Sequence, residues 1–469
     1  MFKKKNLKDK FPLFLLKSED SNKIINYQEL IGKYKRKINY ILRNINFPGE
    51  IFEINECSTF ITFNIKIFKN FNINDLYLFK SHFNNDFYKV KYRFDINDIN
   101  KKNLLLEIKN NYYNFPNFKN LIIKLKSDYI NEKIILGENY KGQKIYKSLS
   151  KLFIVAQQED KINFVNNLIT TIVLTKDYQE IKFKILNKED FKFAYDDSLP
   201  YFEKNKNNIN YSLQEIINIF ETRNNLLKKY NISNFDKYNK SIADKEKKIE
   251  KIILIIPEII DILNNNDPLM IKKFEKIIEY GEKFLIYPII LTNKIDDKNF
   301  KNFNLNLFKK EQKILFSVND FSKNYIFKEK AIDQLFLIGD FLIYNENKFI
   351  HCQQTKISDQ ELKLINNYLK NFYNFKNRKK KLNKNMKLEI EDENSLEQKD
   401  FLIKSAKIIL CEKKEINLQT IQSYMGINYN EAYLILDNLF KYKIIEKEKN
   451  NNNFYKLIDE DICNEIRDF

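Results

Sequence analysis

The sequence predicts an α/β protein in which a mainly parallel sheet is preceded by a small α+β domain and followed by a winged helix-turn-helix domain. Short apolar runs separated by helical segments predict the central sheet: "LFIVA", "IKFKIL", "KIILIIPE", "YPIILT" and "QKILFSV". Runs of this length are typical of buried parallel strands covered on both faces. Three helices followed by two strands near the C-terminal end predict the winged domain.

The chain has 469 residues, enough for several domains with substantial cores. Strand-like runs such as "STFITFNIKIF" and "KNLLLEIKN" alternate with helical stretches, which predicts the α+β domain. We expect a leader at residues 1–21, the α+β domain at 22–134, the α/β domain at 135–374, a charged linker at 375–399 and the winged domain at 400–469. The linker assignment depends on its dense charge and its few large apolar residues.

The elements of the C-terminal domain are predicted one by one. "FLIKSAKIIL" and "LQTIQSYM" predict two helices, and "NYNEAYLILDNLFKYK" predicts a third with an apolar face. Asn428, with Glu431 three residues later, is typical of a capped helix start. "IIEKEKNNNNFYKLI" predicts two strands around an Asn-rich turn.

Composition limits the function classes. A net charge of +18 suits a polyanionic partner, but A/T-rich codons would enrich lysine in the same way. The four cysteines are too scattered for a zinc site and too few to staple the chain, which fits a reducing compartment. We expect His82 and His351 to be surface or half-buried residues rather than ligands, and we predict no metal site.

Membrane insertion is not expected. The most apolar run, "IILIIPEIIDIL", is too short to cross a bilayer and contains Glu258 and Asp261. The first twenty residues have a basic start but no long apolar core, so no signal peptide is predicted.

Four segments occur in an order found in one family. They are "ILGENYKGQKI", "FETRNNLLKKYNISNFDKYNK", "KAIDQLFLIGDFLIY" and "TIQSYMGINYNEA". Together they resemble the cytoplasmic motor of the FtsK/SpoIIIE DNA translocases over nearly the whole chain. The resemblance implies a RecA-like motor domain, ATP and Mg²⁺ as cofactors, and a homo-hexamer on double-stranded DNA. It also implies a cytoplasmic role in chromosome segregation and cell division.

"FIVAQQEDKINFVN" lies where this family has its phosphate-binding P-loop. Taken alone, the segment predicts a strand ending at Ala156, a tight polar loop and a helix from about Asn163. A P-loop needs glycines so that backbone N–H groups can close around phosphates, and here the loop has none. The resemblance places Lys161 on the P-loop lysine and puts Ile162 in place of the Mg²⁺-binding hydroxyl. The favoured interpretation of Lys161 is an exposed loop lysine.

The second catalytic element is altered as well. Pro257 replaces the aspartate of the family's Walker B strand, while Glu258 remains at the position of the water-activating carboxylate. The resemblance implies a nucleotide-sensing role for Thr292 and Asn293, and it implies that Lys323 supplies a positive charge to a neighbouring subunit. The losses together predict a decayed ATPase, so enzymatic activity is not expected.

The winged domain predicts residual DNA binding. The resemblance places Tyr429 and Asn430 on the DNA-reading helix, but Glu431 stands where family members have arginine. Carboxylates repel phosphate, whereas lysines attract it. The predicted phosphate contacts are Lys413, Lys414, Lys441 and Lys447. We therefore expect salt-sensitive and largely non-specific binding of duplex DNA.

Two other functions stay open at this stage. One is an active ATP-driven hexameric translocase of double-stranded DNA with an atypical P-loop. The other is a non-catalytic scaffold that recruits partners through the winged domain. A nucleotide-binding titration separates the first of these from the decayed motor.

Overall fold

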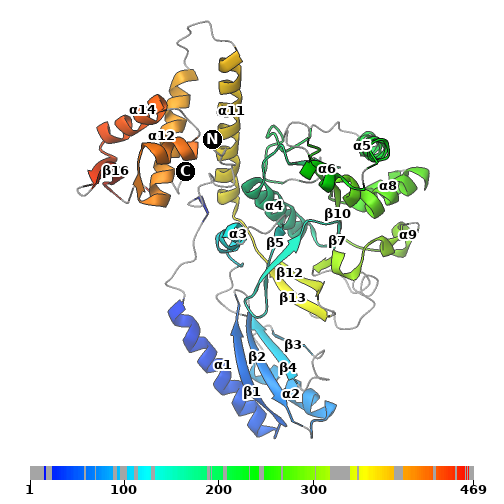
Figure 1. Cartoon of the computed structure of the whole chain (residues 1–469). Coiled ribbons are helices and arrows are strands. Elements are labelled where there is room, and N and C mark those ends of the chain that lie inside the picture. Colours follow the sequence, from blue (N-terminus) through cyan, green and yellow to red (C-terminus); the bar gives the residue numbers. More distant parts are fainter. Residues whose placement is uncertain are drawn as a thin grey trace.

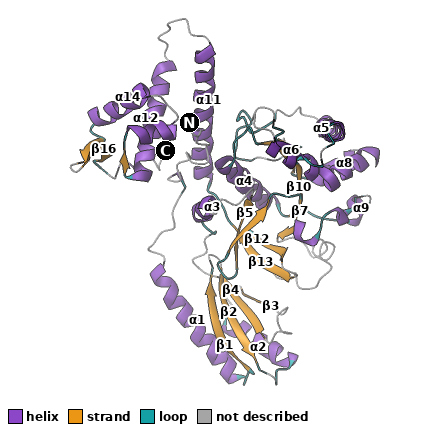
Figure 2. Cartoon of the chain, in the orientation of Figure 1, coloured by secondary structure: helices purple, strands orange, loops and turns teal. Residues whose placement is uncertain are grey.

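The computed structural model contains three sheets and the helices that pack on them (Figures 1 and 2). Its element boundaries follow the apolar runs of the sequence closely. The structure describes residues 15–16, 24–57, 60–68, 70–87, 92–95, 103–109, 115–127, 133–186, 191, 193–203, 209–231, 233–241, 248–265, 268–301, 303–316, 338–345, 348–384, 394–425, 429–448, 451–459, 461 and 463.

The first sheet is antiparallel, in the order β1-β2-β4-β3. Its elements are α1 (Ile24–Asn44), β1 (Gly49–Glu56), β2 (Phe60–Ile67), α2 (Ile73–Asp86), β3 (Tyr92–Asp95) and β4 (Asn103–Lys109). Both helices contribute to one apolar core with alternate residues of β2 and β4, because successive strand residues point to opposite faces.

The central sheet has nine strands in the order β6-β5-β13-β12-β11-β7-β10-β9-β8. They are β5 (Lys133–Asn139), β6 (Lys144–Ser148), β7 (Leu152–Val155), β8 (Ile181–Ile185), β9 (Lys251–Ile256), β10 (Ile286–Thr292), β11 (Lys313–Phe316), β12 (Asp340–Asn345) and β13 (Lys348–Gln354). All five apolar runs named from the sequence form strands, and these strands pair in parallel. The other four strands pair antiparallel, so the sheet is mixed.

β7 lies between β10 and β11, in the middle of the parallel half. This position confirms the predicted central strand. The parallel order β11-β7-β10-β9-β8 places the first strand of the unit inside the sheet, which is the RecA-like α/β arrangement. The carboxyl end of β7 therefore meets the carboxyl ends of its neighbours, where open α/β sheets place their sites.

Helices cover both faces of the central sheet. They are α3 (Phe118–Ser127), α4 (Gln158–Thr175), α5 (Ile209–Lys229), α6 (Phe235–Ser241), α7 (Ile259–Asn265), α8 (Pro268–Tyr280) and α9 (Asp297–Phe300). Leu152 and Ile154 of β7 face the core on the α4 side, whereas Phe153 and Val155 face the core on the α5 and α8 side. The strand is buried throughout, as its continuous apolar sequence predicts.

The third sheet has the order β14-β16-β15 and packs with three helices. Its elements are α12 (Asn394–Lys413), β14 (Glu415–Ile416), α13 (Leu418–Met425), α14 (Tyr429–Lys441), β15 (Ile445–Glu448) and β16 (Asn451–Leu457). α11 (Asp359–Lys384) precedes them, so the described parts of the predicted linker, at 375–384 and 394–399, are helical rather than irregular. Asn428, the predicted helix cap, lies outside the described residues.

Two of the four cysteines are bridged. Cys411 in α12 and Cys463 form a disulfide that closes a segment of 52 residues, and their Cα atoms lie 5.7 Å apart. This bridge was not predicted, because the four cysteines were considered only as too scattered for a zinc site and too few to staple the chain. The pairing of β14 with β16 brings the two ends of the C-terminal unit together. Cys57 and Cys352 are buried thiols.

Among the described residues, no helix is both long enough and apolar enough to cross a membrane.

Candidate functional site

The turn between β7 and α4 is much shorter than the loop predicted from the sequence. α4 begins at Gln158, so only Ala156 and Gln157 separate it from the strand. The predicted helix start near Asn163 was wrong by about a turn. Glu159 and Asp160 lie in the first turn of α4. Their carboxylates favour a helix start there because the N-terminus of a helix carries partial positive charge.

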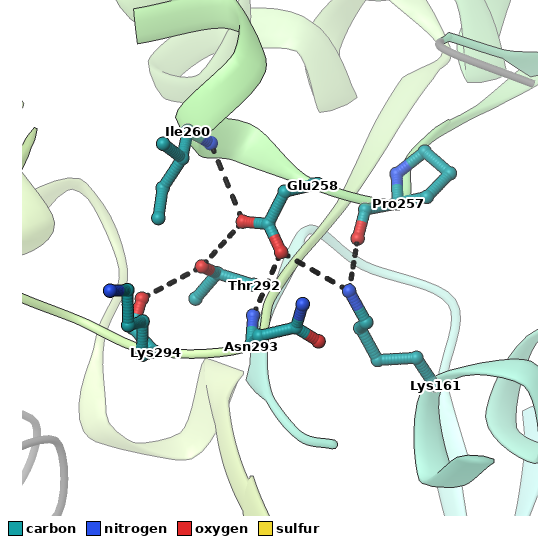
Figure 3. Close-up of polar contacts among 7 residues, drawn as sticks. All are labelled: Lys161, Pro257, Glu258, Ile260, Thr292, Asn293 and Lys294. Atoms are coloured by element: carbon teal, nitrogen blue, oxygen red, sulfur yellow. Dashed lines mark hydrogen bonds and ion pairs between the residues drawn. The ribbon is translucent and has the colours of Figure 1, made fainter. Parts of the chain in front are cut away.

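Lys161 is buried within α4, with 1% of its surface exposed. The interpretation of Lys161 as an exposed loop lysine was therefore wrong. Its Nζ lies 3.2 Å from the Glu258 carboxylate and donates to the Pro257 carbonyl oxygen at 3.0 Å (Figure 3). A buried lysine needs such partners because an unpaired ammonium is costly to remove from water.

Glu258 is held from four directions (Figure 3). Its Oε1 accepts from the Thr292 hydroxyl at 2.6 Å and from the Ile260 N–H at 3.5 Å. Its Oε2 accepts from the Asn293 N–H at 2.9 Å and pairs with Lys161. The carboxylate is thus a fixed acceptor, and its lone pairs are already used by the protein.

The structure therefore brings together four residues that the sequence analysis placed in one site: Lys161, Glu258, Thr292 and Asn293. They come from α4, from the end of β9 and from the end of β10. The Thr292 hydroxyl also lies 2.8 Å from the Lys294 carbonyl, and its single hydrogen serves one acceptor at a time. We name this cluster the Lys161–Glu258 site.

Two opposing effects act on the charge of Lys161. Burial lowers the pKa of Lys161, and the carboxylates of Glu258 and Asp261 oppose that shift. The carboxylate of Glu258 is the nearer of the two, since it is the one that contacts Nζ. The ammonium is consequently stabilised by carboxylates of the chain itself.

A hydrogen bond of Asp160 joins the first turn of α4 to the residue before β12, in the antiparallel half of the central sheet. The Asp160 Oδ1 accepts from the Gly339 N–H at 2.7 Å. Gly339 has φ +84°, and a Cβ there would meet Gln353 Nε2 at 2.5 Å and Phe115 at 2.8 Å. Glycine is therefore required for this close approach. Burial raises the pKa of Asp160 to about 6, although the Gly339 N–H partly offsets the shift.

Replacing Asp160 with asparagine is expected to change how stability depends on pH. Because the folded pKa of Asp160, about 6, lies above its usual value of 3.8, the folded state holds the proton more tightly. Its contribution to stability is present below about pH 4 and is lost as pH rises to about 6. D160N should flatten that fall and be more stable at pH 7 by up to roughly 3 kcal/mol.

Urea unfolding at half-unit steps from pH 4 to 7 measures this difference. E159Q is the matched control, because it removes the same charge from a half-exposed side chain whose partner among the described residues is Lys356, at 3.1 Å. E159Q should keep most of the wild-type slope, because burial is the largest cause of the raised pKa of Asp160 and the charge of Glu159 adds less. Parallel curves for D160N and the wild type would contradict the assignment.

The residues present do not fit ATP and Mg²⁺. The Lys161 ammonium already forms an ion pair with the Glu258 carboxylate. Ile162 is partly buried, packs against the core and has no hydroxyl to bind Mg²⁺. With two residues between β7 and α4, no loop remains to surround a triphosphate. In the described part of the chain, no group of three or more His, Cys, Asp or Glu side chains could hold a metal ion.

Other predicted site residues lie elsewhere. Lys323 falls outside the described residues. Tyr429 and Asn430 begin α14, where Tyr429 is 58% exposed. Lys441 forms an ion pair with Asp437 at 2.7 Å, so its charge is partly neutralised. The remaining predicted phosphate contacts, Lys413, Lys414 and Lys447, are exposed on the C-terminal unit.

Sequence reasoning missed two contributors to the Lys161–Glu258 site. The Pro257 carbonyl accepts from Lys161, although Pro257 was considered only as a lost aspartate. Asp160, next to Lys161 in α4, was not predicted to accept from the Gly339 N–H, which lies far along the chain. Neither contact has a local sequence signal, because both partners are distant in sequence.

Comparison with known proteins gives weak similarities. No protein-family profile matches the sequence. The chain is 26% identical over 517 positions to Protein Ycf2 of Physcomitrium patens, covering 97% of this chain and 22% of that protein. It is 21% identical over 310 positions to DNA translocase FtsK of Staphylococcus epidermidis, covering 63% of this chain and 38% of that protein. The chain thus spans well under half the length of these relatives.

Solved structures resemble the chain at low identity. The pCW3 conjugation coupling protein TcpA, a monomer form with ATPγS, is 12% identical with a TM-score of 0.48, covering 73% of this chain and 99% of that chain. The cytoplasmic domain of the Thermomonospora curvata Type VII secretion ATPase EccC is 9% identical with a TM-score of 0.40, covering 50% of this chain and 31% of that chain. TM-scores this low add no argument to the α/β fold described above.

Proposed function

We propose that this chain is a non-hydrolysing relative of FtsK-type DNA translocases that keeps the motor fold and binds duplex DNA. The observation that carries the proposal is the buried Lys161–Glu258 ion pair. In a P-loop enzyme the corresponding lysine contacts phosphates and the carboxylate polarises water. In this chain the Lys161 ammonium and the Glu258 carboxylate form an ion pair with each other.

DNA binding forms the second part of the proposal. The order of helices and strands in the C-terminal unit supports a winged helix-turn-helix in which α14 would be the recognition helix. Lys443 and Lys447 are exposed around the β15–β16 hairpin, and the whole chain has a net charge of +18. Lysine contacts to phosphate give affinity without sequence preference. Oligomerisation on DNA and a role in chromosome segregation and cell division belong to this same proposal.

Nucleotide titration tests the proposal. Wild-type protein in excess Mg²⁺ should show no heat of ATPγS binding and no phosphate release from ATP, with or without duplex DNA. K161A should give the same result, because Lys161 is not available to phosphate. Phosphate release by the wild type that K161A abolishes would establish an active translocase instead.

A scaffold function is the second candidate, and one feature favours it. Tyr429, Tyr433 and Leu434 of α14 are 58%, 53% and 58% exposed, and the two tyrosine rings stack at 6.5 Å. Apolar side chains on a recognition helix suit a protein partner better than a phosphate backbone. If duplex DNA fails to bind even at low salt, the scaffold replaces the DNA-binding proposal.

A further inference from the structure

One face of α1 packs against the rest of the protein, and the opposite face is exposed. The packed face contributes to the core of the four-stranded sheet and consists of Ile31, Tyr34, Ile38, Ile41 and Leu42. These positions recur every three to four residues, so they lie on one side of the helix. α1 runs along the outer side of that sheet in Figure 1.

The opposite side of α1 carries Lys33, Arg36, Tyr40 and Arg43, all exposed, with Tyr40 at 62%. Their spacing of three, four and three residues aligns them in one straight row, which we name the α1 ridge. At 1.5 Å per residue the ridge is about 15 Å long. It lies opposite the buried face, so the packing of the helix does not account for it.

Arginine is rare in this protein. The sequence contains six arginines among 81 basic residues. Arg223 is buried and donates to the carbonyl oxygens of Phe284 and Glu250. Arg36 and Arg43, by contrast, have no ion pair or hydrogen bond with any other described residue. Two guanidinium groups are thus presented to solvent on the same helix face.

Lys37, the residue after Arg36, is a cation of α1 that contributes to packing. Lys37 donates to the Asp86 carbonyl and lies 4.7 Å from the centre of the Phe87 ring. It therefore joins α1 to the end of α2. The cations of the α1 ridge make no such contact, so removing them leaves the packing of α1 intact.

Acidic residues lie near both halves of α1, since Asp86 lies next to Lys37. Glu29 lies one turn before the ridge, and Glu56 of β1 accepts from Gln28 at 3.5 Å. Glu53 of β1 accepts from Asn64 at 2.7 Å. The α1 ridge itself contains three cations and no carboxylate, so its positive charge comes from Lys33, Arg36 and Arg43.

We propose that the α1 ridge binds the phosphate backbone of duplex DNA, as a contact separate from the C-terminal unit; this rests on the DNA binding proposed above. The guanidinium fork matches two phosphate oxygens at once, which an ammonium cannot do. Phosphates on one strand follow each other every 3.4 Å of axis, so a ridge of about 15 Å spans about four of them. The Tyr40 hydroxyl adds a donor between the two arginines.

The test measures duplex affinity as a function of salt for the full chain. A random 30-base-pair duplex is titrated from 50 to 300 mM KCl with wild type, R36E/R43E, R36K/R43K and K272E/K276E. The last variant is the matched control, since Lys272 and Lys276 are exposed on α8 and their reversal removes the same net charge. Each lost phosphate contact lowers the slope of log K against log salt by about 0.9.

R36E/R43E should bind at least tenfold more weakly at 100 mM KCl, with a slope smaller by about 2. R36K/R43K should lose only a few-fold, and K272E/K276E should match the wild type in slope. If R36E/R43E does not fold, R36Q/R43Q takes its place. An unchanged slope in R36E/R43E, or an equal loss in K272E/K276E, overturns the inference while DNA binding stands.

Two remaining outcomes are distinct from these. If the wild type binds no duplex, the proposed function fails and the α1 ridge has no DNA to contact. If R36E/R43E changes sedimentation of the protein without DNA, the ridge is an interface with an acidic surface of a second copy. That result also overturns the inference.

Discussion

K161M is expected to lower the free energy of unfolding by about 3 kcal/mol, since removing one member of a buried ion pair leaves the other unpaired. Glu258 keeps its contacts with Thr292 and Asn293 but loses its cation, and its side chain is only 19% exposed. Guanidinium unfolding followed by circular dichroism measures the loss. ATP hydrolysis should stay at background in both proteins.

A double-mutant cycle separates the pair from the packing of the Lys161 side chain. K161M/E258Q should lose less than the sum of the single variants, because the unpaired charge is then absent. K356M is the matched control: it breaks the exposed pair with Glu159 and should cost less than about 1 kcal/mol. Additive effects of K161M and E258Q would show that the two groups are not coupled.

C411S/C463S is expected to destabilise the C-terminal unit by up to about 4 kcal/mol, because the bridge constrains the unfolded chain over a long loop. The closed segment is 52 residues long. The bond forms only under oxidising conditions, so dithiothreitol should shift the unfolding of the wild type toward that of C411S/C463S and leave the variant unchanged. Proteolytic susceptibility of residues 394–457 gives the readout for this unit.

Thiol counting under denaturing conditions checks the premise of that experiment. Cys57 and Cys352 should react before reduction, and all four cysteines should react after it. Four reactive thiols in the oxidised protein would contradict the Cys411–Cys463 bridge.

The sequence predicted the strands of the central sheet well because each is a short, almost uninterrupted apolar run. β7 and β10 are buried at every position. Each can therefore be predicted as a strand from its own apolar run, without knowledge of the strands that pair with it. The antiparallel half was harder. β13 contains His351, Cys352 and Gln353 and lacks a continuous apolar pattern, and its pairing with β5 depends on residues far apart in sequence.

The members of the Lys161–Glu258 site were predicted through the family resemblance, but their state was not. Composition favours exposure for lysine, and only the fold shows that Glu258, distant in sequence, offers a buried partner. The start of α4 was missed for a related reason. Gln157 occupies the cap position without a side-chain hydrogen bond, so the sequence has no typical capping residue that would predict the start of the helix.

The pairing of β5 with β13 has a consequence for synthesis of the chain. Gly137 of β5 pairs with Gln354 of β13, and all seven other strands of the central sheet are translated between them. At roughly 5–20 residues per second, the β5–β6 hairpin waits on the order of 10–40 s on the ribosome before its partner emerges. During that interval β5 presents an open edge with the buried side chains Ile134, Ile135 and Leu136. We therefore expect a nascent chain of this protein to need protection of this strand edge until translation has passed residue 354.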